Sequence, residues 1–149
     1  MLKAVPHHLF TSNCTISGDG YAAKILLDLF TETGKIQFDG KSYGVEKDGL
    51  FSGSWQLTLN GETIMSSKKP SSFYRTFEIY TKEHLLSLKA MSAFGRTMGL
   101  KGDGFDVMFT PENPFTRRTN ITGEYADFLS LCFAYWLVVL MWRRAQQSS

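Results

Sequence analysis

The stretch FLSLCFAYWLVVLMW at residues 128–142 decides the fold, because it holds fifteen residues without a charge. Helical spacing of these residues leaves no polar face apart from Ser130. A helix that is apolar all round must be enclosed by protein or by lipid. The rest of the chain therefore has to indicate which of the two surrounds it.

The residues that flank this stretch match the two ends of a helix. Acids precede it and cations follow it, as the helix dipole favours: Glu124, Asp127, Arg143 and Arg144. Thr122 is suited to cap the first turn. We therefore predict a C-terminal helix over about residues 123–145.

Length argues against lipid as the surrounding medium. Fifteen helical residues span about 22 Å, whereas the hydrocarbon of a bilayer is roughly 30 Å thick. Lengthening the segment would bring Asp127 or Arg143 toward the bilayer, at a cost of about 2.5 to 3.5 kcal/mol each near its centre. A tail-anchored membrane protein that uses the stretch from Phe128 to Trp142 as its span stays open as the alternative.

The chain before the helix is dominated by apolar residues at alternate positions of short segments, which is typical of strands. In SWQLTLN, the side chains of Trp55, Leu57 and Leu59 share one face. The same alternation recurs in KILLDLF, FYRTFEIY, HLLSLKA and GFDVMF. Asp39-Gly40, Asp48-Gly49 and Asn60-Gly61 are typical of tight hairpin turns, so neighbouring strands are expected to be antiparallel.

The number of strands supports a barrel around the helix. At roughly ten residues per strand and turn, the residues before the helix allow about ten to twelve strands, within about residues 8–121. A barrel of eight strands is filled by its own side chains, so a central helix needs a larger one. We predict an all-β protein with one helix: a single domain, residues 1–149, in which a closed antiparallel β-barrel of about 10–12 strands surrounds the buried C-terminal helix.

Composition bounds the function only loosely. The 149 residues are 43% hydrophobic and 20% charged with a net charge of +2, which excludes a disordered chain and gives no reason to expect nucleic acid as a partner. Cys14 and Cys132 form no CxxC pair, so neither a zinc site nor a disulfide framework is predicted. The N-terminus lacks the pattern of a secretory signal, and we expect a cytoplasmic protein.

Two features resemble catalytic or metal sites but lack the local structure or the spacing that such sites require. The GKSYG stretch at residues 40–44 fits a nucleophile elbow, but Ser42 is expected in a hairpin strand rather than before a helix. His7, His8 and His84 lack the spacing of a zinc site. We therefore predict no enzyme, no catalytic residue, no metal and no cofactor.

Scattered cations are the candidate binding residues. A barrel could gather some of them into a surface that attracts anionic headgroups: Lys68, Lys69, Arg75, Arg96, Arg117 and Arg118. The alternative is an ordinary soluble surface, on which cations and anions are interspersed.

Four segments carry a family resemblance across most of the chain. They are GSWQLTLNGE at 53–62, GRTMGLKGDG at 95–104, NPFTRRTNI at 113–121 and FAYWLVVLMWRR at 133–144. Their order resembles the tubby C-terminal-like fold, shared by tubby domains, plant LURP-one-related proteins and phospholipid scramblases. The resemblance implies a barrel of about twelve strands around a hydrophobic C-terminal helix.

For function, the resemblance implies a non-enzymatic intracellular binding module, peripheral to a membrane, that meets anionic phospholipid or phosphoinositide. A scramblase-like lipid transporter is a further alternative, although only Glu124 and Asp127 stand where scramblases have an acidic calcium-binding segment. The basic pocket of tubby domains is not matched residue by residue, so no binding residue is carried over. Neither a protein partner nor an oligomeric state is predicted.

Overall fold

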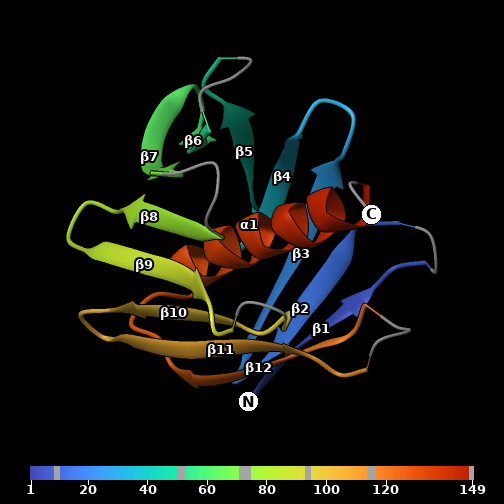
Figure 1. Cartoon of the computed structure of the whole chain (residues 1–149). Coiled ribbons are helices and arrows are strands. Elements are labelled where there is room, and N and C mark those ends of the chain that lie inside the picture. Colours follow the sequence, from blue (N-terminus) through green and yellow to red (C-terminus); the bar gives the residue numbers. More distant parts are fainter. Residues whose placement is uncertain (9–10, 50–52, 71–74, 93–94, 114–116, 148–149) are drawn as a thin grey trace.

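The computed structural model describes residues 1–8, 11–49, 53–70, 75–92, 95–113 and 117–147 (Figure 1). Within these residues the chain forms twelve strands and one helix: β1 (Leu2–Pro6), β2 (Cys14–Gly18), β3 (Tyr21–Asp28), β4 (Thr33–Phe38), β5 (Lys41–Lys47), β6 (Ser54–Leu59), β7 (Glu62–Lys68), β8 (Thr76–Tyr80), β9 (Leu85–Ala90), β10 (Met98–Gly102), β11 (Phe105–Pro111), β12 (Thr119–Glu124) and α1 (Phe128–Gln147).

The strands close into one barrel, which confirms the predicted fold class. Each strand pairs antiparallel with the next one in sequence, and β1 pairs with β12 to complete the ring. Figure 1 shows α1 running through the middle of the ring. By length and composition α1 could cross a membrane, but most of it is buried inside the barrel.

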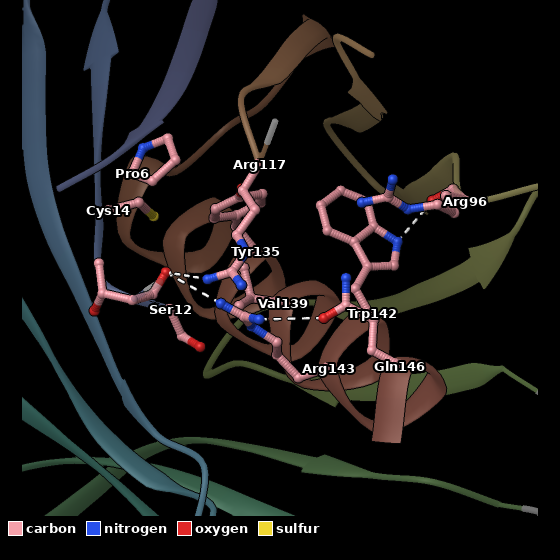
Figure 2. A pocket seen from close by; sticks show the side chains of 11 residues that line it. Pro6, Ser12, Cys14, Arg96, Arg117, Tyr135, Val139, Trp142, Arg143 and Gln146 are labelled. Atoms are coloured by element: carbon pink, nitrogen blue, oxygen red, sulfur yellow. Dashed lines mark hydrogen bonds between the residues drawn. The ribbon is translucent and has the colours of Figure 1, made fainter. Parts of the chain in front are cut away.

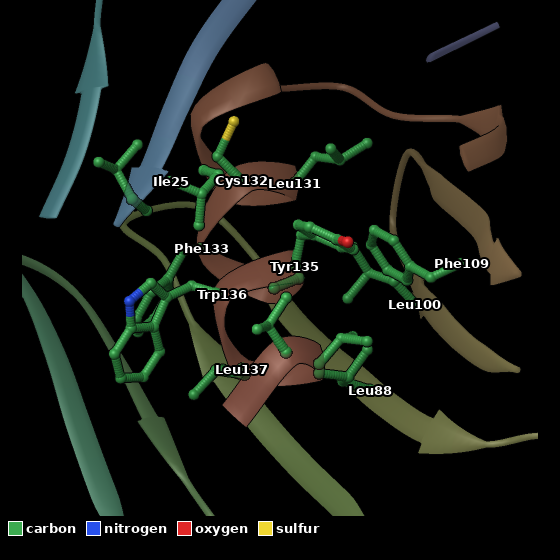
Figure 3. Packing of buried hydrophobic residues seen from close by; sticks show 14 of the residues in the cluster. Ile25, Leu88, Leu100, Phe109, Leu131, Cys132, Phe133, Tyr135, Trp136 and Leu137 are labelled. Carbon is green, nitrogen blue, oxygen red and sulfur yellow. The ribbon is translucent and has the colours of Figure 1, made fainter. Parts of the chain in front are cut away.

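The core is the contact between α1 and the inward faces of the strands (Figure 3). Tyr135, Leu137 and Leu140 of α1 are all buried among strand residues. The polar groups of two large aromatic side chains of α1 have hydrogen-bond partners. The Tyr135 hydroxyl lies 2.8 Å from Thr119 Oγ1. The indole of Trp136 donates to the carbonyl oxygen of Leu26 on β3 at 3.0 Å. The helix therefore occupies the interior of this barrel, whereas side chains alone fill an eight-stranded barrel.

Short turns close one end of the barrel. Asn60 and Gly61 both have positive φ angles, at 53° and 82°, as a two-residue hairpin turn requires. The turn at Asp39 and Gly40 is of the same kind, which confirms both predictions. The predicted tight turn at Asp48-Gly49 is wrong, because β5 ends at Lys47 and β6 begins only at Ser54.

Two predicted boundaries are also wrong. The first strand, β1, lies before residue 8 and was not expected, because its five residues show too short an alternation to stand out. The helix begins at Phe128 rather than near residue 123, since Thr122 pairs with Met108 in the barrel. Asp127 caps it instead, accepting a hydrogen bond from the backbone N–H of Ser130 at 3.0 Å.

A bulge lies between β6 and β7. Their register shifts between Leu57 and Thr58, and the extra residue is Ile64 on β7. Trp55 and Leu57 are buried and Leu59 packs half-buried against the core, so the predicted face of β6 is confirmed. Thr58 lies opposite Gly44 on β5, and its hydroxyl donates to the Gly44 carbonyl oxygen.

Candidate functional site

The six predicted basic residues all lie at the end of the barrel where α1 finishes. They stand in or beside the β7–β8, β9–β10 and β11–β12 connections: Lys68, Lys69, Arg75, Arg96, Arg117 and Arg118. These connections share one end because successive strands of the barrel alternate in direction. They are three of six, so the six residues follow about half of the rim rather than forming one compact patch.

Three further cations reach the same end. Lys47 is the last residue of β5, and Arg143 and Arg144 lie near the C-terminal end of α1. Arg143 and Arg144 were recognised from the sequence as cations at the end of the helix but were not among the six predicted binding residues, and Lys47 was not singled out. All six arginines of the chain are thus at this end. We call it the arginine end: it comprises the connections that follow β1, β3, β5, β7, β9 and β11, the strand residues next to them, and residues 143–147 of α1.

The two ends of the barrel carry opposite charge. The arginine end has nine basic and four acidic side chains, the acids being Asp28, Glu32, Asp48 and Glu112. The other end, which we call the acidic end, is made of the remaining connections and the strand residues that border them. It has two basic residues, Lys41 and Lys82, and seven acidic ones: Asp19, Asp39, Glu62, Glu83, Asp103, Glu124 and Asp127.

This segregation gives the barrel a charge axis of +5 at one end and −5 at the other, although the whole chain carries only +2. It also matches the dipole of α1, whose N-terminus is at the acidic end and whose C-terminal carbonyls face the cations. A protein charged in this way is turned by the field of an anionic surface so that the arginine end faces it.

Glu32 holds two of these cations in an ion-pair cluster. Its carboxylate accepts hydrogen bonds from Arg144 Nε at 2.6 Å and Arg144 Nη2 at 2.7 Å. Lys47 Nζ lies 2.8 Å from the same carboxylate. Both cations also lie over the ring of Trp55, at 5.6 Å for Lys47 and 5.1 Å for Arg144, and the Trp55 indole donates to the Glu32 carbonyl oxygen.

The hydrogen bonds from Arg144, with a smaller contribution from Lys47, lower the pKa of Glu32 from its ordinary 4.5 to about 2. Burial opposes the shift but is outweighed. Burial and the nearby charge of Arg144 also lower the pKa of Lys69. The Glu32 cluster therefore ties the β3–β4 connection to the end of α1.

Other cations at this end are held by backbone carbonyls and rings. Arg75 donates to the carbonyl oxygens of Gly95 at 2.8 Å and Ser92 at 2.7 Å, and so joins the β7–β8 and β9–β10 connections. The guanidinium of Arg96 lies 5.2 Å from the centre of the Trp142 ring. Lys68 and Arg118 are exposed. The rim thus combines fixed and freely accessible cations.

A small pocket of about 20 Å³ lies beside the last turn of α1 (Figure 2). Its walls include Ser12, Arg117, Trp142 and Arg143. Arg117 Nη1 and Arg143 Nη2 both donate to the carbonyl oxygen of Thr11, the latter at 3.1 Å. Two guanidinium groups therefore converge on one backbone oxygen.

The other features that the sequence singled out lie away from this end or show no site geometry. Ser42 is in β5, in a hairpin rather than before a helix. The His7 ring forms a hydrogen bond with the Thr15 hydroxyl, and the His84 ring packs against the Phe105 ring. Within the described residues, no three His, Cys, Asp or Glu side chains lie close enough together to hold a metal ion.

Comparisons with family models, with curated proteins and with solved structures find no match to this chain. The function is therefore inferred from the arrangement of its residues.

Proposed function

We propose that this protein is a non-enzymatic binding module that docks on anionic phospholipid, with its arginine end facing the membrane surface. The observation that carries the proposal is the gathering of all six arginines at one end of a barrel whose other end is acidic. Kinship with the tubby C-terminal-like fold, and a place at the cytoplasmic face of a membrane, are part of the same proposal.

The charges at this end are sufficient for docking. A Lys or Arg close to an anionic membrane contributes about 1 kcal/mol, and the attraction falls off within a Debye length of about 8 to 10 Å. With a net charge of +5, the arginine end gains several kcal/mol when it faces the surface. Turning the acidic end toward the surface loses a similar amount, so charge alone fixes the orientation.

Phe30 supplies an apolar contact at the same end. It stands in the β3–β4 connection with 98% of its surface exposed. Its backbone N–H donates to Asp28 Oδ1 at 2.9 Å, which stabilises the turn that carries the ring. An exposed aromatic ring beside cations suits the interface of a bilayer, where such rings are buried among headgroups.

By sequence, each of the other five connections at the arginine end also contains a phenylalanine. These residues lie outside the described part of the chain: Phe10, Phe51, Phe73, Phe94 and Phe115. The proposed apolar contact rests on Phe30 alone, and the recurrence of phenylalanine in the sequence agrees with it.

Vesicle co-sedimentation tests the proposal with a matched pair of variants. Lys68→Glu/Arg118→Glu reverses two exposed charges at the arginine end, and Lys41→Glu/Lys82→Glu reverses two exposed charges at the acidic end. Both variants change the net charge equally. If the arginine end faces the membrane, only the first variant should lose binding to vesicles that contain phosphatidylserine. Equal loss in the two variants would show that orientation plays no part. Equal binding of the unmodified protein to neutral and anionic vesicles would refute docking by charge.

A separate substitution tests the apolar contact. Phe30→Ser should weaken binding to anionic vesicles at every salt concentration, whereas the charge variants should lose most at low salt. Unchanged binding of Phe30→Ser would remove the ring from the proposal.

The alternatives fit the observed arrangement less well. A tail anchor would require residues 128–142 to leave the barrel in which they are buried. Extraction with alkaline carbonate distinguishes the two, since a docked protein is released and an anchored one is retained. For a scramblase-like transporter, Asp127 is engaged as the helix cap, and within the described part of the chain no three acidic side chains lie close enough together to hold calcium.

A further inference from the structure

We propose that the pocket between Arg117 and Arg143 binds a phosphate group. The pocket lies at the arginine end, where the β1–β2 and β11–β12 connections meet the last turn of α1 (Figure 2). Such a site has its own ligand chemistry and does not depend on docking to a membrane.

Arg143 is the residue that carries this inference. Its side chain reaches into the wall of the pocket, and the residue is only 8% exposed. Nη2 donates to the Thr11 carbonyl oxygen and Nη1 donates to Gln146 Oε1, both at 3.1 Å. Nε is buried and has no hydrogen-bond partner among the residues that the structure describes. A buried guanidinium donor without an acceptor is costly, and an anionic oxygen would satisfy it.

Ser12 adds a second donor without a partner. Its hydroxyl is buried in the wall of the same pocket, and within the described part of the chain it forms no hydrogen bond. The hydroxyl of Tyr135, by contrast, is already engaged with Thr119. Two unpartnered polar groups, one in a connection and one on a helix, therefore belong to residues that line the same pocket.

The two guanidinium groups of the pocket lie close to each other. Because Arg117 and Arg143 bond to the same oxygen of Thr11, their donating nitrogens lie within about 6 Å of each other. No ion pair between either guanidinium and a carboxylate occurs among the described residues. Burial lowers the pKa of Arg117, as expected for a cation held away from water.

The charge to be balanced selects the ligand class. A phosphate monoester carries about −1.5 to −2 at pH 7, whereas a carboxylate carries only −1. The higher charge suits the two guanidinium groups that converge on Thr11, with Arg96 as a third cation in the wall of the pocket. The pocket of about 20 Å³ admits one or two oxygen-sized atoms. One phosphate oxygen would therefore enter between Ser12 and Arg143, while the others stay at the mouth within reach of Arg117.

Titration with inorganic phosphate tests the site. Phosphate should raise the thermal unfolding midpoint of the full chain and change the fluorescence of Trp142, which lines the pocket, relative to chloride at equal ionic strength. With a Kd of about 1 mM, 20 mM phosphate should raise the midpoint by several degrees. No difference between phosphate and chloride would overturn the proposal.

Neighbouring arginines provide a matched pair of variants. Arg117→Gln removes a donor at the pocket, and Arg118→Gln removes the same charge from an exposed neighbour. Arg117→Gln should weaken phosphate binding at least tenfold, and Arg118→Gln should leave it within twofold. Equal weakening would indicate general attraction and overturn the site. Ser12→Ala, which removes only a hydroxyl, should weaken binding several-fold and keeps the test usable if Arg117→Gln does not fold.

Vesicles distinguish the two sources of a phosphate monoester. If the pocket takes a lipid headgroup, vesicles with phosphatidic acid should bind more tightly than phosphatidylserine vesicles of equal surface charge, and free phosphate should compete. If it takes a soluble phosphate, the two kinds of vesicle should bind equally while the phosphate titration persists. Absence of vesicle binding with a positive titration would refute membrane docking and retain the pocket.

Discussion

Glu32→Gln should destabilise the protein and at the same time strengthen its binding to anionic vesicles. The shift of the Glu32 pKa from 4.5 to about 2 corresponds to an upper bound of about 3 kcal/mol. The Glu32 side chain is only 18% exposed, but Arg144 is 37% exposed, so solvent screens part of the pairing. We expect a loss of about 1 to 2 kcal/mol in the free energy of unfolding at pH 7.

The pH dependence fixes the origin of this loss. Because the pKa of Glu32 is lower in the folded protein, its contribution is complete above pH 4.5 and is lost as the pH falls toward 2. Urea unfolding should therefore show a difference between the unmodified protein and Glu32→Gln that is largest near pH 7 and disappears near pH 2. A difference that stays constant over this range would refute an origin in the charge of Glu32.

Glu112→Gln is the matched control, because Glu112 is also an acid of the arginine end. Its contact with Lys3 is longer, at 3.7 Å, and more exposed, so this variant should lose less than 0.5 kcal/mol, the order expected for a weak surface pair. Both variants raise the charge of the arginine end by one and should bind anionic vesicles roughly fivefold more tightly. Weaker vesicle binding by a folded Glu32→Gln would contradict docking through this end.

Three further predictions concern the barrel. Removing residues 128–147 should abolish cooperative unfolding in circular dichroism, because the strands lose the helix that fills them; a cooperative transition in the truncated chain would contradict this. Leu137→Ala should cost about 2 to 5 kcal/mol in urea unfolding because Leu137 is fully buried, whereas Leu85→Ala, at a residue 61% exposed, should cost little. Gly123→Ala should lower the thermal midpoint by several degrees, because Gly123 has a φ of 112° and a Cβ there would lie 2.0 Å from the Asp106 carbonyl oxygen; an unchanged midpoint would show that β12 adjusts freely.

The features predicted correctly from the sequence are those with a local pattern. An uncharged run of fifteen residues requires enclosure, and alternating strands before it are numerous enough to enclose it. The boundaries that failed depend on pairing between distant segments. Thr122 fits the local pattern of a helix cap, but it pairs with Met108 and so belongs to β12. The strand β1 forms because it pairs with both β2 and β12. The register shift between Leu57 and Thr58 also had no local signal, because it is a property of two paired strands.

The candidate site was predictable in composition but not in arrangement. The sequence indicates that Lys68 and Arg118 are cations in turns, but their common end follows only from the direction of β7 and β12 in a twelve-strand ring. Because neighbouring strands run in opposite directions, the connections that follow odd-numbered strands all lie at one end, and numbering the predicted strands would have shown this. The convergence of Arg117 and Arg143 on Thr11 had no sequence signal, because the three residues are joined only by closure of the barrel around α1.

Measuring which end of the barrel meets the membrane tests the proposed docking directly. An environment-sensitive NBD fluorophore attached at Phe30→Cys reports on the arginine end, and one at Asn60→Cys reports on the opposite end; the native Cys14 and Cys132 are buried. With vesicles that contain phosphatidylserine, emission at position 30 should shift to the blue and brighten, while emission at position 60 stays unchanged. A shift at position 60, or none at position 30 while the protein is bound, would contradict docking through the arginine end.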